Sequence, residues 1–277
     1  MLRSAVTICL VPEARQGPFV FHDGLEAGCR AAAQVGFDAV EIFPGAADEI
    51  PADRLRGLLE PHGLGVAAVG TGAGWVRLRL HLCHADAAIR ARAREFIGSI
   101  IDAAADLGAP AIIGSMQGQW SAEVPRDEAL GHLADALGQL ADRAASRGRT
   151  LLYEPLNRYE TNLFNRQADA AAFLRDRGLG NIRLLCDLFH MNIEEADVAA
   201  ALAACGDLVG HVHWADSNRL AMGLGHTDPR PVVAALAAIG YEGYVSAEVF
   251  PLPTPLDAAR RTIQSLESLE PPSPSAA

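Results

Sequence analysis

The sequence predicts an α/β protein that folds as a single (β/α)8 barrel over residues 1–269. Short apolar runs alternate with longer stretches of helical spacing, which is typical of strand–helix–strand units in a parallel sheet. Eight such runs occur within 277 residues, and this number and rhythm fit a closed barrel better than a doubly wound sheet. The Pro/Ser-rich segment 270–277 is predicted to be a disordered tail.

The predicted strands are short and follow one another at the spacing of strand–helix units. They cover residues 5–10, 38–43, 65–69, 110–114, 150–154, 182–187, 208–213 and 244–248. Between them, apolar side chains recur at helical spacing in residues 31–36, 97–107 and 129–145. Several helices are expected to end in a glycine, because glycine readily adopts the left-handed conformation that turns the chain into the next strand. These glycines are Gly36, Gly63, Gly108, Gly148 and Gly240.

The net charge and the cysteines limit the partners and the cellular location that the protein is expected to have. The chain carries 34 acidic and 23 basic residues, a formal charge of −11, which repels phosphate backbones and anionic lipid. Nucleic-acid and membrane partners are therefore not expected, and no apolar stretch has membrane-spanning length. The five cysteines are scattered, which predicts reduced thiols, and the N-terminal residues resemble a strand rather than a secretion signal. We expect a soluble, cytoplasmic protein.

Four polar residues close four successive predicted strands: Glu154, Asp187, His213 and Glu248. We call these four residues the strand-end ring. The carboxyl ends of barrel strands meet at one face, where the active sites of such barrels are assembled, so the four side chains are expected to converge. Acidic residues also occur at strand ends because they precede helix N-termini, which explains one or two of them but not four in succession.

The strand-end ring offers three hard carboxylate donors and one imidazole nitrogen. Such an oxygen-rich set with a single histidine suits Mn²⁺, Mg²⁺ or Co²⁺ better than a structural zinc, which prefers thiolates. Without a cation, three carboxylates in one mouth would repel each other and raise their own pKa values. The sequence therefore predicts one divalent metal ion held by the strand-end ring.

Polar and aromatic residues follow the ring residues in the loops above the barrel. Glu160, His190 and Arg219 are candidates for substrate contacts. Each also has a structural explanation: Glu160 as a solvated surface acid, His190 as a helix cap and Arg219 as a partner of Asp216 or Asp228. His211 is interpreted as a hydrogen-bonded interior residue rather than a metal ligand. Three aromatic residues just beyond strand ends are candidates for the pocket wall: Trp120, Trp214 and Phe250.

Three segments carry a family resemblance. They are Glu154-Pro-Leu-Asn-Arg-Tyr-Glu160, Cys186-Asp187-Leu-Phe-His190-Met-Asn-Ile-Glu-Glu and His211-Val-His213-Trp-Ala-Asp-Ser-Asn-Arg219. They resemble the sugar isomerase/epimerase family of xylose-isomerase-like TIM barrels, and within it the ketose 3-epimerases of the tagatose/psicose type. The resemblance spans nearly the whole barrel but is specific from about the fifth strand onward. One departure is Ala221-Met222-Gly223, where an Ala-Pro-Gly-type turn is expected.

The resemblance implies an isomerase with a defined set of site residues. Its members bind one divalent metal, usually Mn²⁺, at positions that match the strand-end ring. Their proton-transfer pair matches Glu154 and Glu248, and their substrate contacts match Glu160, His190 and Arg219. It also implies a homodimer or homotetramer and a sugar or sugar-acid substrate.

The expected reaction follows from the ring chemistry. A metal chelated by a ketone and the neighbouring hydroxyl acidifies the carbon-bound proton, and a carboxylate removes it to give an enediolate. Return of the proton to the opposite face by a second glutamate inverts the centre, which predicts a metal-dependent epimerase of a ketose or keto-sugar acid. Return to the adjacent carbon would make an aldose–ketose isomerase of the hydroxypyruvate type. Expulsion of a β-hydroxyl would make an inosose-type dehydratase.

The same residues allow two further functions. An apurinic-site endonuclease would need more histidine ligands from the earlier strands, where His81 and His84 lie past the third strand rather than at its end. The acidic charge also argues against DNA. A sugar-binding module with a structural metal is the alternative that involves no catalysis, and binding without turnover would support it.

Overall fold

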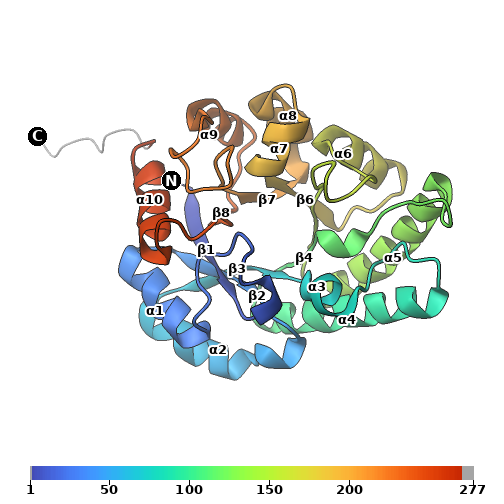
Figure 1. The fold of residues 1–277 in the computed structure, drawn as a ribbon, viewed down its shortest axis with the longest axis horizontal. Helices are drawn as coiled ribbons and strands as arrows, with labels where there is room; N and C mark the ends of the chain where they lie inside the picture. Colours follow the sequence, from blue (N-terminus) through green and yellow to red (C-terminus); the bar gives the residue numbers. More distant parts are fainter. Residues whose placement is uncertain (1, 270–277) are drawn as a thin grey trace, which may run out of the picture.

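Eight parallel strands close into a barrel in the computed structural model, which describes residues 2–269. Each strand pairs with the next one in sequence, and β1 pairs with β8 to close the sheet. The strands are β1 (Arg3–Cys9), β2 (Ala39–Phe43), β3 (Gly65–Gly70), β4 (Ala111–Ile113), β5 (Leu151–Tyr153), β6 (Ile182–Asp187), β7 (Val209–His213) and β8 (Tyr244–Ala247). The predicted fold class is confirmed (Figure 1).

The helices surround the barrel and cover the outer face of its strands (Figure 1). They are α1 (Leu25–Val35), α2 (Ala52–Leu59), α3 (Ala73–Leu78), α4 (Ala87–Asp106), α5 (Arg126–Ser146), α6 (Gln167–Asp176), α7 (Leu188–Glu194), α8 (Val198–Cys205), α9 (Pro229–Ala238) and α10 (Pro255–Glu267). The three predicted helical stretches fall on α1, α4 and α5. All five predicted glycines have a positive φ, between 65° and 100°, as the left-handed turn requires.

Some strand boundaries differ from the prediction. β1 begins at Arg3 rather than at residue 5, while β5 ends at Tyr153 and β8 at Ala247, one residue before the ring glutamates. Pro155 follows Glu154 and has no N–H to continue the ladder. The Glu154 N–H still donates to the Ile113 carbonyl of β4 at 3.0 Å. The glutamate backbone is therefore fixed although it lies outside the strand.

Side-chain alternation along the strands directs the strand-end ring into the barrel. Ala68, Ile112, Leu152 and Leu185 form a buried cluster of their own, contributed by β3, β4, β5 and β6. Leu152 and Leu185 stand two positions before Glu154 and Asp187, and side chains two apart on a strand point to the same face. The ring residues of β5 and β6 therefore project into the same space above this layer.

A larger apolar core lies between the barrel and its helices. In the described part of the chain, no helix is both long and apolar enough to span a membrane. The predicted disordered tail, 270–277, lies outside the described residues, so that interpretation stays a prediction.

Candidate active site

The structure brings the four residues of the strand-end ring together around one imidazole edge. The Nδ1 atom of His213 lies 3.3 Å from Asp187 Oδ2, 3.4 Å from Glu248 Oε2 and 3.6 Å from Glu154 Oε1. None of these four side chains is more than 13 % exposed. Nδ1 and the three carboxylates therefore form one buried group of atoms that can act together as ligands.

The donor set fits a divalent cation. The ligand atoms of Glu154, Asp187 and His213 all lie within 4.8 Å of one another, and all three residues are buried. Arg219 contacts Asp187 and Glu248 through Nη2, at 3.4 and 2.5 Å. When all three carboxylates are ionised and His213 is neutral, as metal ligands must be, one arginine offsets one charge and about two negative charges remain in a buried place. Buried charges require a partner, and an ion of charge +2 matches this excess.

The two ring glutamates lie in unequal electrostatic environments. Burial raises the pKa of Glu154 well above its usual value, and the nearby Glu248 and Asp187 charges raise it further. Burial acts in the same direction on Glu248, but His213 and Arg219 outweigh it and lower the pKa of that carboxyl. The difference follows from position, because Arg219 contacts Glu248 directly.

Arg219 reaches the ring from a loop that Asp216 holds in place. The buried Asp216 carboxylate accepts four backbone N–H groups, from Ser217, Gly223, Gly225 and Thr227, at 2.7–3.0 Å. Burial raises the pKa of this carboxyl, but these hydrogen bonds outweigh it and lower the value to about 2. Asp216 is thus a loop anchor rather than the arginine's partner. Because it fixes Gly223, the turn that lacks the expected proline is still held.

Asp228 is not the arginine's partner either, because it pairs with Arg230 at 2.7 Å. Arg219 instead lies over the ring of Phe189, 4.7 Å from its centroid. From this position the guanidinium reaches the strand-end ring. The Arg219 backbone has a φ of 59°, which lies in the left-handed region.

His190 is positioned by Asn157, a residue that the sequence reasoning did not single out. The Asn157 backbone N–H donates to His190 Nδ1 at 3.3 Å, and its side-chain amide lies 2.7 Å from the same atom. Two N–H groups of Asn157 face Nδ1, which makes it the acceptor and leaves the proton of the neutral ring on Nε2, although the Arg219 Nη1 donor lies 3.4 Å from Nε2. That Nε2 lies 3.6 Å from Asp187 Oδ2 and 3.8 Å from Glu154 Oε1. Burial lowers the pKa of His190, so a neutral N–H donor faces the ring.

Glu160 completes this side of the site. Its carboxylate accepts from the Asn157 side-chain amide at 3.0 Å and lies 3.9 Å from His190 Nδ1. Its side chain is 45 % exposed and lines the cavity above the ring. The structure thus places all three predicted substrate-contact residues beside the strand-end ring.

Glu41 is a buried acid of β2 that the sequence reasoning missed. Its carboxylate lies 2.7 Å from His211 Nε2 and 3.1 Å from His213 Nε2, so one side chain joins two histidines of β7. Burial raises the pKa of Glu41, but the two imidazoles outweigh it and lower the value. His213 therefore has Nε2 occupied by Glu41 and Nδ1 turned towards the ring. A carboxylate behind a metal-binding histidine fixes its orientation and raises its basicity.

The Glu41→Gln variant is expected to bind Mn²⁺ about 10- to 100-fold more weakly, because the amide keeps the shape but loses the charge that orients His213. Competition with a fluorescent chelator measures the dissociation constant directly. Glu123→Gln, which removes a charge from the exposed rim of the same cavity, serves as the matched control and should bind as the wild type does. Equal affinities for all three proteins would contradict the role of Glu41.

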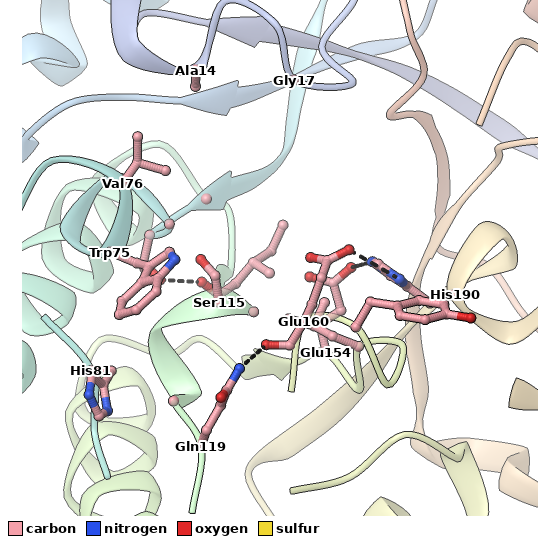
Figure 2. Close-up of a pocket in the computed structure, with 18 of the residues that line it drawn as sticks. Ala14, Gly17, Trp75, Val76, His81, Ser115, Gln119, Glu154, Glu160 and His190 are labelled. Atoms are coloured by element: carbon pink, nitrogen blue, oxygen red, sulfur yellow. Dashed lines mark hydrogen bonds and ion pairs between the residues drawn. The ribbon is translucent and has the colours of Figure 1, made fainter. Parts of the chain in front are cut away.

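A cavity of about 790 Å³ opens above the ring. Its lining includes Glu154, His213, Glu248, Glu160, His190 and Arg219. Figure 2 shows Glu154, Glu160 and His190 on one side of the cavity and Trp75, Val76 and His81 on the other, with Ser115 between them. Of the three aromatic candidates for this wall, Trp120 lines the cavity. Trp214 is fully buried and donates from Nε1 to Ser265, and Phe250 is not among the lining residues.

The family of xylose isomerase-like TIM barrels matches residues 29–269. The chain belongs to this family. The resemblance inferred from the three sequence segments is thereby confirmed.

Characterised members of the family support a narrower comparison. The chain is 34 % identical over 221 residues to the L-ribulose 3-epimerase of Mesorhizobium japonicum, covering 78 % of this chain and 72 % of that protein. It is 31 % identical over 225 residues to the D-psicose 3-epimerase of Agrobacterium fabrum, covering 79 % and 76 %. A solved structure of an L-ribulose 3-epimerase superposes with a TM-score of 0.81 at 28 % identity, over 97 % of this chain and 94 % of the other. These relatives are ketose 3-epimerases.

Proposed function

We propose that the protein is a divalent-metal-dependent sugar epimerase that inverts the carbon next to the ketone of a ketose or keto-sugar acid. The observation that carries the proposal is the pair of glutamates, Glu154 and Glu248, whose carboxylates lie 3.6 and 3.4 Å from His213 Nδ1 and line an open cavity. The similarity to L-ribulose and D-psicose 3-epimerases supports the same reaction class.

The strand-end ring would hold the ion. Three carboxylates and one imidazole suit Mn²⁺, which we propose ahead of Mg²⁺ and Co²⁺. When bound, the ion would polarise the ketone and the neighbouring hydroxyl, which makes the proton on the carbon between them more acidic.

The protein's own residues would move and position the proton. Glu154 and Glu248 come from the ends of β5 and β8, three strands apart, so they can approach the reacting carbon from different sides. One glutamate would take the proton as a general base, and the other would return one to the opposite face. The His190 Nε2–H and the Arg219 guanidinium present donors where negative charge develops on the substrate oxygens.

The rival reactions differ in where the proton goes. An aldose–ketose isomerase would return it to the adjacent carbon, and a dehydratase would expel a β-hydroxyl instead. Both could use the same ring, but the 3-epimerase relatives favour inversion at one carbon.

We further propose that the protein is cytoplasmic and assembles as a homodimer or homotetramer. Light scattering on the purified protein tests the assembly directly.

Proton exchange in D₂O tests the proposed function. Metal-stripped protein with and without added Mn²⁺ is offered a panel of ketoses and keto-sugar acids, and deuterium incorporation is followed by NMR. We expect Mn²⁺-dependent exchange at the carbon beside the ketone together with an inverted product. Exchange without inversion would favour an isomerase or a dehydratase, and an ultraviolet-absorbing enone would identify the latter. Absence of exchange across the panel would contradict the proposal.

Gly114 supplies a separate prediction, because its backbone packs against the Glu154 carboxylate. A Cβ at this position would overlap Glu154 Oε2. Gly114→Ala should therefore displace the carboxylate and lower kcat/KM by about 100-fold, as misplacement by about 1 Å can do. Gly131→Ala on α5, where a Cβ meets nothing within 4 Å, should leave kcat/KM unchanged. Full activity in Gly114→Ala would show that Glu154 tolerates displacement.

A further inference from the structure

The cavity above the strand-end ring is larger than one sugar requires. A ketohexose has twelve non-hydrogen atoms, and if each occupied as much space as a water molecule the sugar would fill at most about 360 Å³. The cavity measures about 790 Å³. More than half of it therefore stays open when a single ketose is held at the ring.

One wall of the cavity carries none of the proton-transfer residues. Figure 2 shows this wall, formed by Trp75, Val76 and His81, opposite Glu154 and His190. Trp75 and Val76 belong to α3, which directly follows β3 after two loop residues. We call the part of the cavity lined by Trp75, His81 and Trp120 the distal pocket.

Trp120 is exposed yet rigidly held in the distal pocket. Trp120 is 40 % exposed, although tryptophan residues are highly buried on average. Its backbone N–H donates to Asn162 Oδ1 and its Nε1–H to the Asn162 carbonyl, both at 2.9 Å. The Asn162 amide returns a hydrogen bond to the Trp120 carbonyl at 3.0 Å. A ring fixed before the ligand arrives loses little entropy on binding, which makes it a prepared stacking surface.

His81 adds a polar group beside the aromatic rings. Its ring meets Trp75 edge-on at 5.8 Å between centroids. Its Nδ1 is buried without a hydrogen-bond partner among the described residues, and it faces Gly118, where a Cβ would overlap it. Nε2 is therefore the nitrogen left for a ligand. Burial, and then His84, lower the pKa of His81 to about 4, so the imidazole is neutral near pH 7 and suits a hydroxyl group.

The charge of the lining selects the kind of ligand. Outside the strand-end ring and Glu41, three glutamates line the described cavity: Glu13, Glu123 and Glu160. The one arginine of the lining, Arg219, already contacts Asp187 and Glu248. A phosphate or carboxylate on the far end of the substrate would be repelled. A sugar ring matches the distal pocket, because its C–H face is apolar and its hydroxyls form hydrogen bonds.

We propose that Trp75, His81 and Trp120 form a second sugar subsite, and that the preferred substrate is an uncharged keto-sugar joined to a second sugar ring. The inference rests on the proposed function, because the strand-end ring is what would hold the ketone-bearing unit. The second ring would stack on the aromatic side chains at the distal end.

Turnover of matched ketoses tests this subsite. D-fructose is compared with fructose disaccharides that keep a free ketone and differ in linkage: lactulose, turanose, leucrose and isomaltulose. We expect wild-type protein with Mn²⁺ to exchange at least one disaccharide with a kcat/KM about tenfold above that of D-fructose. Trp120→Ala should lower kcat/KM for the disaccharide more than for D-fructose and so remove this advantage, while Leu256→Ala, an exposed apolar residue of α10, should change neither. A wild-type preference for free D-fructose over every disaccharide would overturn the subsite.

Binding without turnover separates this proposal from the proposed function. Two of the three tryptophans line the distal pocket, so intrinsic fluorescence reports its occupation. Disaccharide should quench the wild type at lower concentration than D-fructose does, with or without Mn²⁺. Trp120→Phe, which keeps a ring, should retain more of this difference than Trp120→Ala, and Trp75→Leu provides a second variant if Trp120→Ala does not fold. Quenching without exchange would overturn the epimerase but keep the subsite; equal quenching by both sugars would overturn the subsite.

Discussion

Replacement of Glu154 or Glu248 by glutamine is expected to abolish net epimerisation, with kcat lowered by about 100- to 10,000-fold. Glutamine keeps the side-chain shape and one oxygen ligand but cannot accept the substrate proton. The two residues approach the site from different strands, β5 and β8. Each variant should therefore lose proton exchange with a different epimer of the same sugar.

Deuterium exchange resolves the two roles. With one glutamate intact, the epimer that it deprotonates should still exchange with D₂O, while the other epimer should not, and neither should invert. The two variants should show opposite patterns. Bound metal is measured in each protein, so that loss of the ion is not mistaken for loss of the base. Glu123→Gln, which removes a charge from the exposed rim of the cavity, is the control and should retain exchange of both epimers. Full activity in both ring variants would eliminate the proposed mechanism.

Removal of the metal is expected to cost both activity and stability. Ligand binding stabilises the folded state by about 4 kcal/mol when the free ion exceeds its dissociation constant about 1,000-fold. A chain of this size gains roughly 2 °C in Tm for each kcal/mol, so Mn²⁺ should raise Tm by roughly 8 °C. Differential scanning fluorimetry of chelator-treated protein, with and without Mn²⁺, measures the shift.

Asp187→Asn is the matched variant for this measurement. Asp187 also caps α7 by accepting the Phe189 N–H at 2.8 Å, and asparagine keeps that cap while losing the charge. Its Tm should therefore respond little to Mn²⁺. The wild-type shift should shrink as the pH falls, because the pKa values of Glu154 and His213 are raised and protons compete with the ion for both. A shift of equal size in both proteins would place the metal elsewhere.

The fold and the strand-end ring were accessible from the sequence because both depend on local patterns. Strand–helix alternation gives the barrel, and a polar residue at the end of each of the last four apolar runs gives the ring. The ends of the strands were predicted less accurately, because they depend on hydrogen bonds to the neighbouring strand as well as on the local sequence. Glu154 shows this, because its N–H still bonds β4 after the strand itself has ended.

The missed residues depend on contacts between distant segments. Glu41 acquires its role from His211 and His213, which follow it by 170 and 172 residues. A lone glutamate in an apolar strand gives no sign of such partners, although a charged residue inside a predicted barrel strand is itself unusual. Trp120 was predicted to line the pocket, but its rigidity, which comes from Asn162, 42 residues later, was not predicted. Pairing of this kind emerges only when the barrel closes.

Asp216 has a consequence for how this enzyme can change over evolution. One buried carboxylate fixes the main chain at four points between Ser217 and Thr227, so the path of the loop does not depend on the side chains between those points. Residues with exposed side chains, such as Leu224 and His226, can be exchanged while Arg219 stays beside the strand-end ring. The loop can therefore accept substitutions at its exposed positions over evolution, while its anchor keeps the backbone of Arg219 in place.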